Sequence, residues 1–173
     1  GRMTAEERIF SIVRGGLYAK LPSLALPLGR LTCREGDVDP AGTDGEAAVF
    51  APGLLRREFL AESDLPERLT LHLLLHLMLG HPWGRQGRAR ALWDTACDLA
   101  VGLVRHALLP QEPETPAAFS ARCKLQARRA VRAPAIYALL LEQPDALTAE
   151  EQAAFYLDDH RLWQLSASAS APK

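Results

Sequence analysis

Two histidines one helical turn apart are the residues of this sequence best suited to chemistry. His72 and His76 lie in the run LTLHLLLHLMLG, residues 69–80, whose apolar residues surround a helix and predict a segment buried on all sides. Because positions i and i+4 share one helix face, both imidazoles can reach the same tetrahedral cation. A buried imidazole nitrogen left without a partner costs roughly 1–3 kcal/mol. A metal ion, most naturally zinc, would satisfy one nitrogen of each ring.

The same spacing is compatible with a metal-free core, in which each ring would bond a backbone carbonyl or a carboxylate. A hydrolytic zinc site needs three protein ligands and an open position for water, so a third ligand must come from another element. Asp98 in WDTACDLA is the expected third ligand. Asp94 shares its helix face and is a possible second-shell residue, although the positive end of the helix already explains a carboxylate there. His81 is a reserve ligand or a second-shell neighbour.

The elements that must position these residues are mostly helices. Capping boxes begin two of them, Thr4 with Glu7 and Thr148 with Glu151, and Gly80 ends the histidine helix. Gly15 and Gly16 are expected to weaken the end of the first helix. The expected helices span about 4–17, 63–80, 89–106, 116–141 with a bend or break before Pro134, and 148–163.

Between residues 21 and 59 the sequence changes to short apolar runs broken by proline and glycine. LALPLGRLTC (24–33) and EAAVFA (46–51) are the expected strands, and DVDPAGTDG (37–45) has the composition of a turn. These patterns predict a small, mainly antiparallel sheet. The fold class expected is therefore α+β, mostly helical.

Composition bounds the organisation and excludes several classes of partner. A chain of 173 residues predicts one domain, placed at 4–163, with a flexible tail at 164–173. A net charge of -1 offers no general attraction to nucleic acid or to an anionic membrane, and no apolar run is long enough to span a bilayer. Cys33, Cys97 and Cys123 lie far apart, which favours reduced thiols and a cytoplasmic protein.

Four segments, in order, resemble a metallopeptidase domain found ahead of a von Willebrand A-like domain in many bacterial proteins. They are TDGEAAVFAPGLL, HLLLHLMLGH, WDTACDLAVGLV and DDHRLW, and the resemblance covers roughly residues 4–163. It implies a zincin-like fold, with helices packed around the sheet, and zinc bound by His72, His76 and Asp98. It also implies that Asp159 and His160 stand near the site as second-shell residues, although a solvated helix end would explain them equally. A von Willebrand A-like domain or a MoxR-type AAA+ ATPase is the implied protein partner.

One position departs from the HExxH pattern of such peptidases. Leu73 follows the first histidine, where the pattern has the glutamate that takes a proton from zinc-bound water. Leucine cannot move a proton, and loss of one acid or base group costs a factor of about 10² to 10⁴ in rate. We therefore expect a non-catalytic binding or regulatory module that keeps the zinc site or its geometric relic. The alternatives are an active zinc hydrolase that uses another carboxylate, such as Asp94 or Asp159, and a metal-free helical interaction domain.

Overall fold

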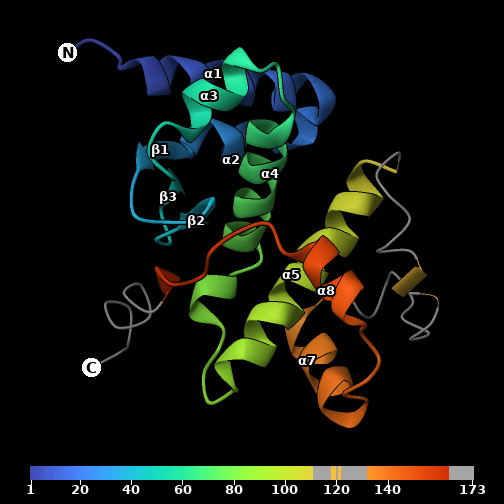
Figure 1. Ribbon diagram of the computed structural model, residues 1–173. Helices are drawn as coiled ribbons and strands as arrows, with labels where there is room; N and C mark the ends of the chain where they lie inside the picture. The colour runs from blue at the N-terminus through green and yellow to red at the C-terminus, as the bar shows by residue number, and fades with distance from the viewer. Residues whose placement is uncertain (111–117, 120, 122–131, 164–173) are drawn as a thin grey trace.

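The computed structural model describes residues 1–110, 118–119, 121 and 132–163 (Figure 1). The fold is α+β and mostly helical, as the sequence predicts. The strands are β1 Thr32–Glu35, β2 Ala41–Thr43 and β3 Ala47–Phe50. The helices are α1 Ala5–Lys20, α2 Ala25–Arg30, α3 Leu54–Leu60, α4 Leu65–Met78, α5 Arg90–Leu108, α7 Ala133–Glu142 and α8 Ala149–Phe155, with short 3₁₀ turns at Pro22–Leu24 and His81–Trp83.

Both predicted capping boxes are present. The Thr4 hydroxyl accepts a bond from the Glu7 amide, and the Glu7 carboxylate accepts one from the Thr4 amide; Thr148 and Glu151 repeat the pattern. The two glycines near the predicted end of the first helix do not stop it, since α1 continues to Lys20. In α1, capping chemistry therefore locates the start of the helix better than glycine locates its end, whereas Gly80, in a left-handed conformation, follows the end of α4 as predicted.

Helix α8 is shorter than predicted. It ends at Phe155 instead of continuing to Trp163, and the chain beyond it runs alongside the small sheet. The Asp159 amide donates to the Ala41 carbonyl at 2.7 Å, a bond that an amide inside a helix could not make. Pairing with a distant strand has replaced the last two turns of helix.

The sheet is mixed rather than mainly antiparallel, with strand order β1-β3-β2. β1 runs parallel to β3, and β2 runs antiparallel to it. The predicted strand 46–51 is confirmed by β3. Of the predicted turn 37–45, only the carboxyl end forms a turn, where Asp44 and Gly45 join β2 to β3. β2 itself lies inside the segment predicted as a turn.

Two helices occupy the region predicted as strands and turns. The first part of LALPLGRLTC forms α2, which buries Leu28 in the core; Pro27 is compatible with this helix because it stands in the first turn, where its missing N–H is not needed. The second is α3, which follows Gly53 in a left-handed conformation and buries Leu54 and Leu55 in the core. Short apolar runs do not distinguish strand from buried helix by period alone.

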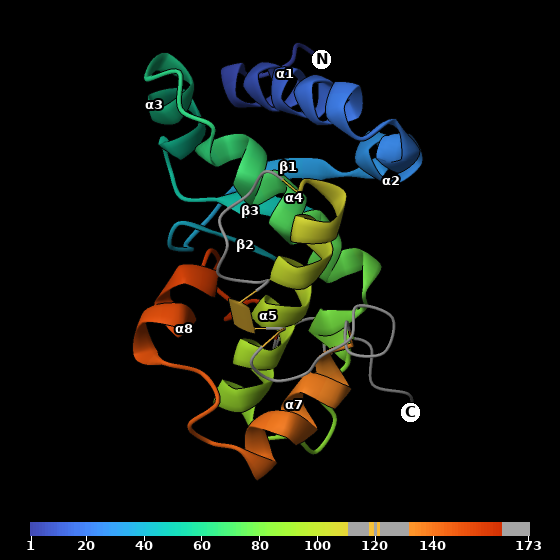
Figure 2. The same ribbon diagram turned by 90° about the vertical axis from the view of Figure 1, so that its right-hand side faces the viewer.

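Helix α4 is the centre of the molecule. Its residues from Leu69 to His76 are all buried, as an apolar pattern on every side predicts. On one side it packs with α1 and the sheet, and on the other it crosses α5, against which α7 and α8 are laid (Figures 1 and 2). The predicted helix 116–141 is confirmed from 133 onward and at residues 118–119 and 121; residues 116–117, 120 and 122–131, like the predicted tail, lie outside the described residues. None of the described helices has the length and apolar character needed to cross a membrane.

Candidate metal centre

Helix α4 presents His72 and His76 on one face, as their spacing predicts. Both side chains are buried, their ring centroids are 4.5 Å apart, and their Nε2 atoms approach to 2.9 Å. The leucines of the same helix occupy the remaining directions and belong to the hydrophobic core. The helix therefore delivers two nitrogen donors to one point inside the protein.

Helix α5 delivers Asp98 to the same point. Ala96, Cys97 and Ala100 around it are small and buried, and they pack in the core cluster that α5 shares with α7 and Phe155. The Oδ1 atom of Asp98 lies 3.2 Å from Nε2 of His72 and 3.1 Å from Nε2 of His76. The three residues expected as zinc ligands are thus brought together.

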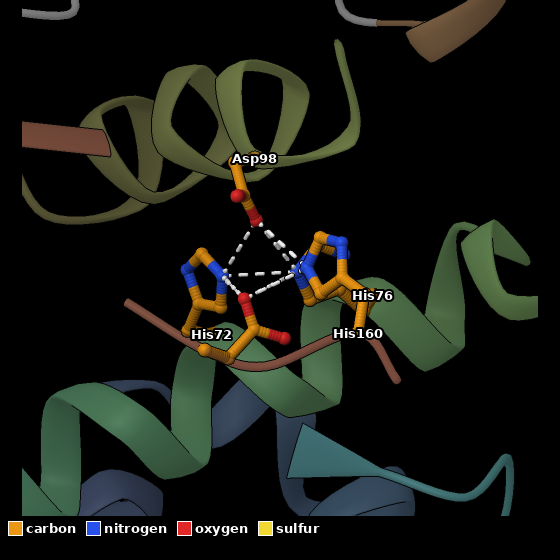
Figure 3. A group of neighbouring side chains, drawn as sticks. His72, His76, Asp98 and His160 are labelled. Carbon is orange, nitrogen blue, oxygen red and sulfur yellow. Dashed lines mark hydrogen bonds and ion pairs between the residues drawn. The ribbon is translucent and has the colours of Figure 1, made fainter. Parts of the chain in front are cut away.

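Two further donors come from the segment that follows α8. Oδ1 of Asp158 lies 2.8 Å from Nε2 of His72, and Nε2 of His160 lies 2.9 Å from Oδ1 of Asp158 and 3.1 Å from Oδ1 of Asp98. Figure 3 shows the histidine and Asp98 side chains converging from separate parts of the chain. All five donor atoms lie within 4.8 Å of one another, and all five residues are buried.

Hydrogen bonds alone cannot satisfy this cluster. Nε2 of His76 faces three atoms within 3.3 Å, namely His72 Nε2, Asp98 Oδ1 and Asp158 Oδ1, but a ring nitrogen carries one hydrogen at most. Oδ2 of Asp158 is also buried without a hydrogen-bond partner among the described residues. A cation at the centre would accept one lone pair from each of the five donor atoms. With ligand distances of about 2.0–2.2 Å, donors around such an ion stand roughly 3 Å apart, as they do here.

The charges of the cluster favour a cation. Burial by itself lowers the pKa of His72, but the carboxylates of Asp158 and Asp98 outweigh it and raise that pKa to about 9. The pKa of His160 lies well above its ordinary value for the same reason. Burial opposes ionisation of Asp158, yet the neighbouring histidines hold its pKa well below its usual range. Two carboxylates and three neutral imidazoles around a divalent cation carry no net charge, which suits a buried site.

Two other predicted residues contact the ring nitrogens that face away from the centre. Oδ1 of Asp94 lies 3.0 Å from Nδ1 of His160, and Nδ1 of His81 lies 2.9 Å from Nδ1 of His76. Burial and then the charge of His76 lower the pKa of His81 to about 2, so His81 is neutral and can accept a hydrogen bond. The indole of Trp163 stacks on His160 with ring centroids 3.7 Å apart. These contacts orient the rings with Nε2 directed inward.

The remaining predicted positions fall elsewhere. The Asp159 carboxylate turns away from the cluster and bonds to Arg161 and the Asp39 amide. His160 contributes a donor atom to the cluster itself, whereas the sequence predicted a supporting position. Leu73 is fully buried in the hydrophobic core.

Asp158 was not selected from the sequence. The available signal was its spacing of two from His160, because alternate residues of an extended segment face the same side. A helix was expected there, and a helix would have separated them.

A cavity of about 310 Å³ lies against one side of the cluster. Three of the five donor residues, Asp98, Asp158 and His160, contribute to its lining, together with Arg90 and Thr95 of α5 and residues of α8. A second cavity of about 420 Å³, lined by leucines of α7 and the following loop, shares Ala91, Thr95 and Gln152 with the first. The five donor residues are therefore covered by α4 on one side and border a cavity on the other.

Comparison with known proteins identifies one family. The searches of curated proteins and of solved structures gave no match. A family described as "Putative metallopeptidase domain" matches residues 15–156, which is most of the chain and contains His72, His76 and Asp98. Asp158 and His160 follow directly after the matched range. The family match covers most of the chain, and the structure places a buried cluster of histidines and aspartates within and just after it. The chain therefore belongs to this metallopeptidase-domain family.

Proposed function

We propose that this domain binds one divalent transition metal, zinc by expectation, through Nε2 of His72, His76 and His160 and the carboxylates of Asp98 and Asp158. The observation that carries the proposal is the convergence of five donor atoms from three separate elements on one buried point. Imidazole and carboxylate donors suit zinc and the neighbouring first-row metals. A bound ion would hold α4, α5 and the segment after α8 together.

We further propose that the metal serves a binding or regulatory role without peptide hydrolysis. Catalytic zinc sites of the HExxH type keep three protein ligands, an open position for water and a glutamate base. Five protein donors leave less room for water than three. The residue after the first histidine is Leu73, whose side chain is in the apolar core and can neither accept nor donate a proton.

The cavity supports a second candidate, a hydrolase with a different base. A bound metal would supply a polarised water molecule. Asp158 has a carboxylate oxygen without a hydrogen-bond partner among the described residues, and its lowered pKa keeps the carboxylate ionised. Of the two carboxylates considered from the sequence, Asp94 already bonds to His160 and Asp159 to Arg161. Asp158 is therefore the base that this alternative requires.

Metal analysis tests the first proposal. The purified protein is expected to contain close to one equivalent of zinc or another transition metal, and a chelator-treated sample is expected to take up added Zn²⁺. His76→Ala should abolish this uptake, whereas His106→Ala, a histidine of α5 outside the cluster, should retain it. Failure of the wild type to bind any transition metal would leave a metal-free core as the explanation of the cluster.

An activity assay separates the two roles. The non-catalytic proposal expects no turnover of casein or short peptides by the zinc-loaded protein. Turnover that a chelator and His76→Ala both abolish would overturn it. If such turnover were also lost in Asp158→Asn while zinc binding remained, the second candidate would replace the first.

A further inference from the structure

The segment after α8 has two faces with different partners. It is extended around Asp159, so consecutive side chains point to opposite sides. Asp158 and His160 face the metal centre, whereas Asp159 and Arg161 face the loop that precedes β2. One side of this short segment supplies donors, and the other is attached to the sheet region. In Figure 1 the segment crosses from α8 toward β2.

Asp159 makes most of that attachment. Its amide donates to the Ala41 carbonyl at 2.7 Å, and it forms a bridge with Gly42 as an added strand would. Its Oδ2 accepts a bond from the Asp39 amide at 3.3 Å. Its Oδ1 accepts one from the amide of Arg161 at 2.9 Å. Both the backbone and the side chain of this residue therefore fix the segment.

Gly42 allows the close approach on which this attachment depends. A Cβ atom at this position would lie 2.6 Å from the Asp159 carbonyl oxygen, a distance at which one of the two backbones must move. The Arg161 guanidinium bonds both the Asp159 carboxylate and the Asp37 carbonyl. The contact between β2 and the segment is thus specific to these residues.

We infer that Asp159 is a positioning residue for the metal centre, one that sets the Asp158 and His160 donors in place by attaching their segment to β2. The inference rests on the proposed metal binding, and no role as a ligand is implied. His72, His76 and Asp98 are placed by the core packing of α4 and α5 and do not depend on this attachment. Loss of the Asp159 side chain removes its bonds to the Asp39 amide and to Arg161 and leaves only the backbone bond to Ala41, so the Asp158 and His160 donors should be displaced and the other three should stay in place.

A cobalt titration tests this inference, because the visible absorption of Co²⁺ depends on its coordination number. Metal-free samples of the full chain are titrated with Co²⁺, and the affinity is measured by competition with a chelator. Asp159→Ala and Gly42→Ala are expected to weaken binding about 10- to 100-fold and to change the absorption spectrum. Asp159→Asn keeps an acceptor oxygen and is expected to recover much of the affinity. Asp145→Ala, an exposed aspartate, and Gly29→Ala, with open space around its Cβ, are the matched controls.

The readouts distinguish the possible failures. Wild-type affinity and spectrum in Asp159→Ala would overturn the inference while the metal site stands. The variants that lose Co²⁺ affinity could also lose melting temperature to a corresponding extent in their metal-free forms. That result would assign Asp159 a general structural role and would also overturn the inference. A wild-type protein that binds no Co²⁺ would overturn both the inference and the proposed function.

Discussion

Nδ1 of His160 lies 3.0 Å from Oδ1 of Asp94. The contact fixes which ring nitrogen carries the hydrogen, because a carboxylate accepts and Nδ1 must then donate. In the neutral ring that would bind a metal, Nε2 then keeps its lone pair, on the side of Asp98 and Asp158. A carboxylate behind a histidine in this way also raises the basicity of the donor nitrogen.

We predict that Asp94→Ala weakens zinc binding about 10- to 100-fold, since the ring of His160 loses its orienting acceptor. Asp94→Asn retains an oxygen acceptor and should lose less. Chelator competition on the two variants and the wild type measures the effect. Equal affinities in all three proteins would show that the Asp94 contact has no influence on the metal.

Zinc is predicted to raise the stability of the folded protein. A ligand that binds only the native state at 100 times its Kd contributes about 2.7 kcal/mol. The melting temperature should therefore rise on adding zinc and return on adding a chelator. His72→Ala should melt at the same temperature with and without zinc, and a zinc response in that variant equal to the wild type would contradict the ligand assignment.

Gly102→Ala is predicted to destabilise the protein by about 1–3 kcal/mol. A Cβ there would lie 2.6 Å from the ring of Phe155, so α5 and α8 would have to separate. Gly15→Ala, on the exposed side of α1 with nothing near its Cβ, should instead stabilise by about 0.5–1 kcal/mol. Urea denaturation measures the free energy of unfolding of both variants. Similar changes in the two would show that α8 moves to accommodate the Cβ atom at position 102.

Leu73→Glu is predicted to destabilise by about 3 kcal/mol or more without creating peptidase activity. The substitution would place an unpaired charge in the apolar core. Leu26→Glu is the control, since Leu26 is exposed in the first turn of α2, where a carboxylate is favourable. Denaturation and a peptide assay check both parts. Gain of zinc-dependent hydrolysis in Leu73→Glu would show that the domain lacks only its base.

Features encoded by neighbouring residues could be predicted from the sequence. The capping pair Thr4 and Glu7 locates the start of α1, because both bonds are made within one turn. The apolar surroundings of His72 and His76 require a buried helix with both rings on one face, and Asp98 follows from the same periodicity on α5. These relationships lie within single helices, and α4 and α5 are close in the sequence.

Features that depend on distant pairing were decided only by the tertiary structure. Asp158 reaches His72 across 86 residues, and it does so because Asp159 pairs with β2 and ends α8 early. The capping box at Thr148 predicts a helix start, but no local pattern predicts that Asp159 pairs with a strand more than a hundred residues away. The direction of β1 and the helical state of α2 were likewise settled by packing against the core. The sequence by itself determined three donors on two helices; tertiary pairing added Asp158 and His160, because only the folded chain brings their segment to the sheet.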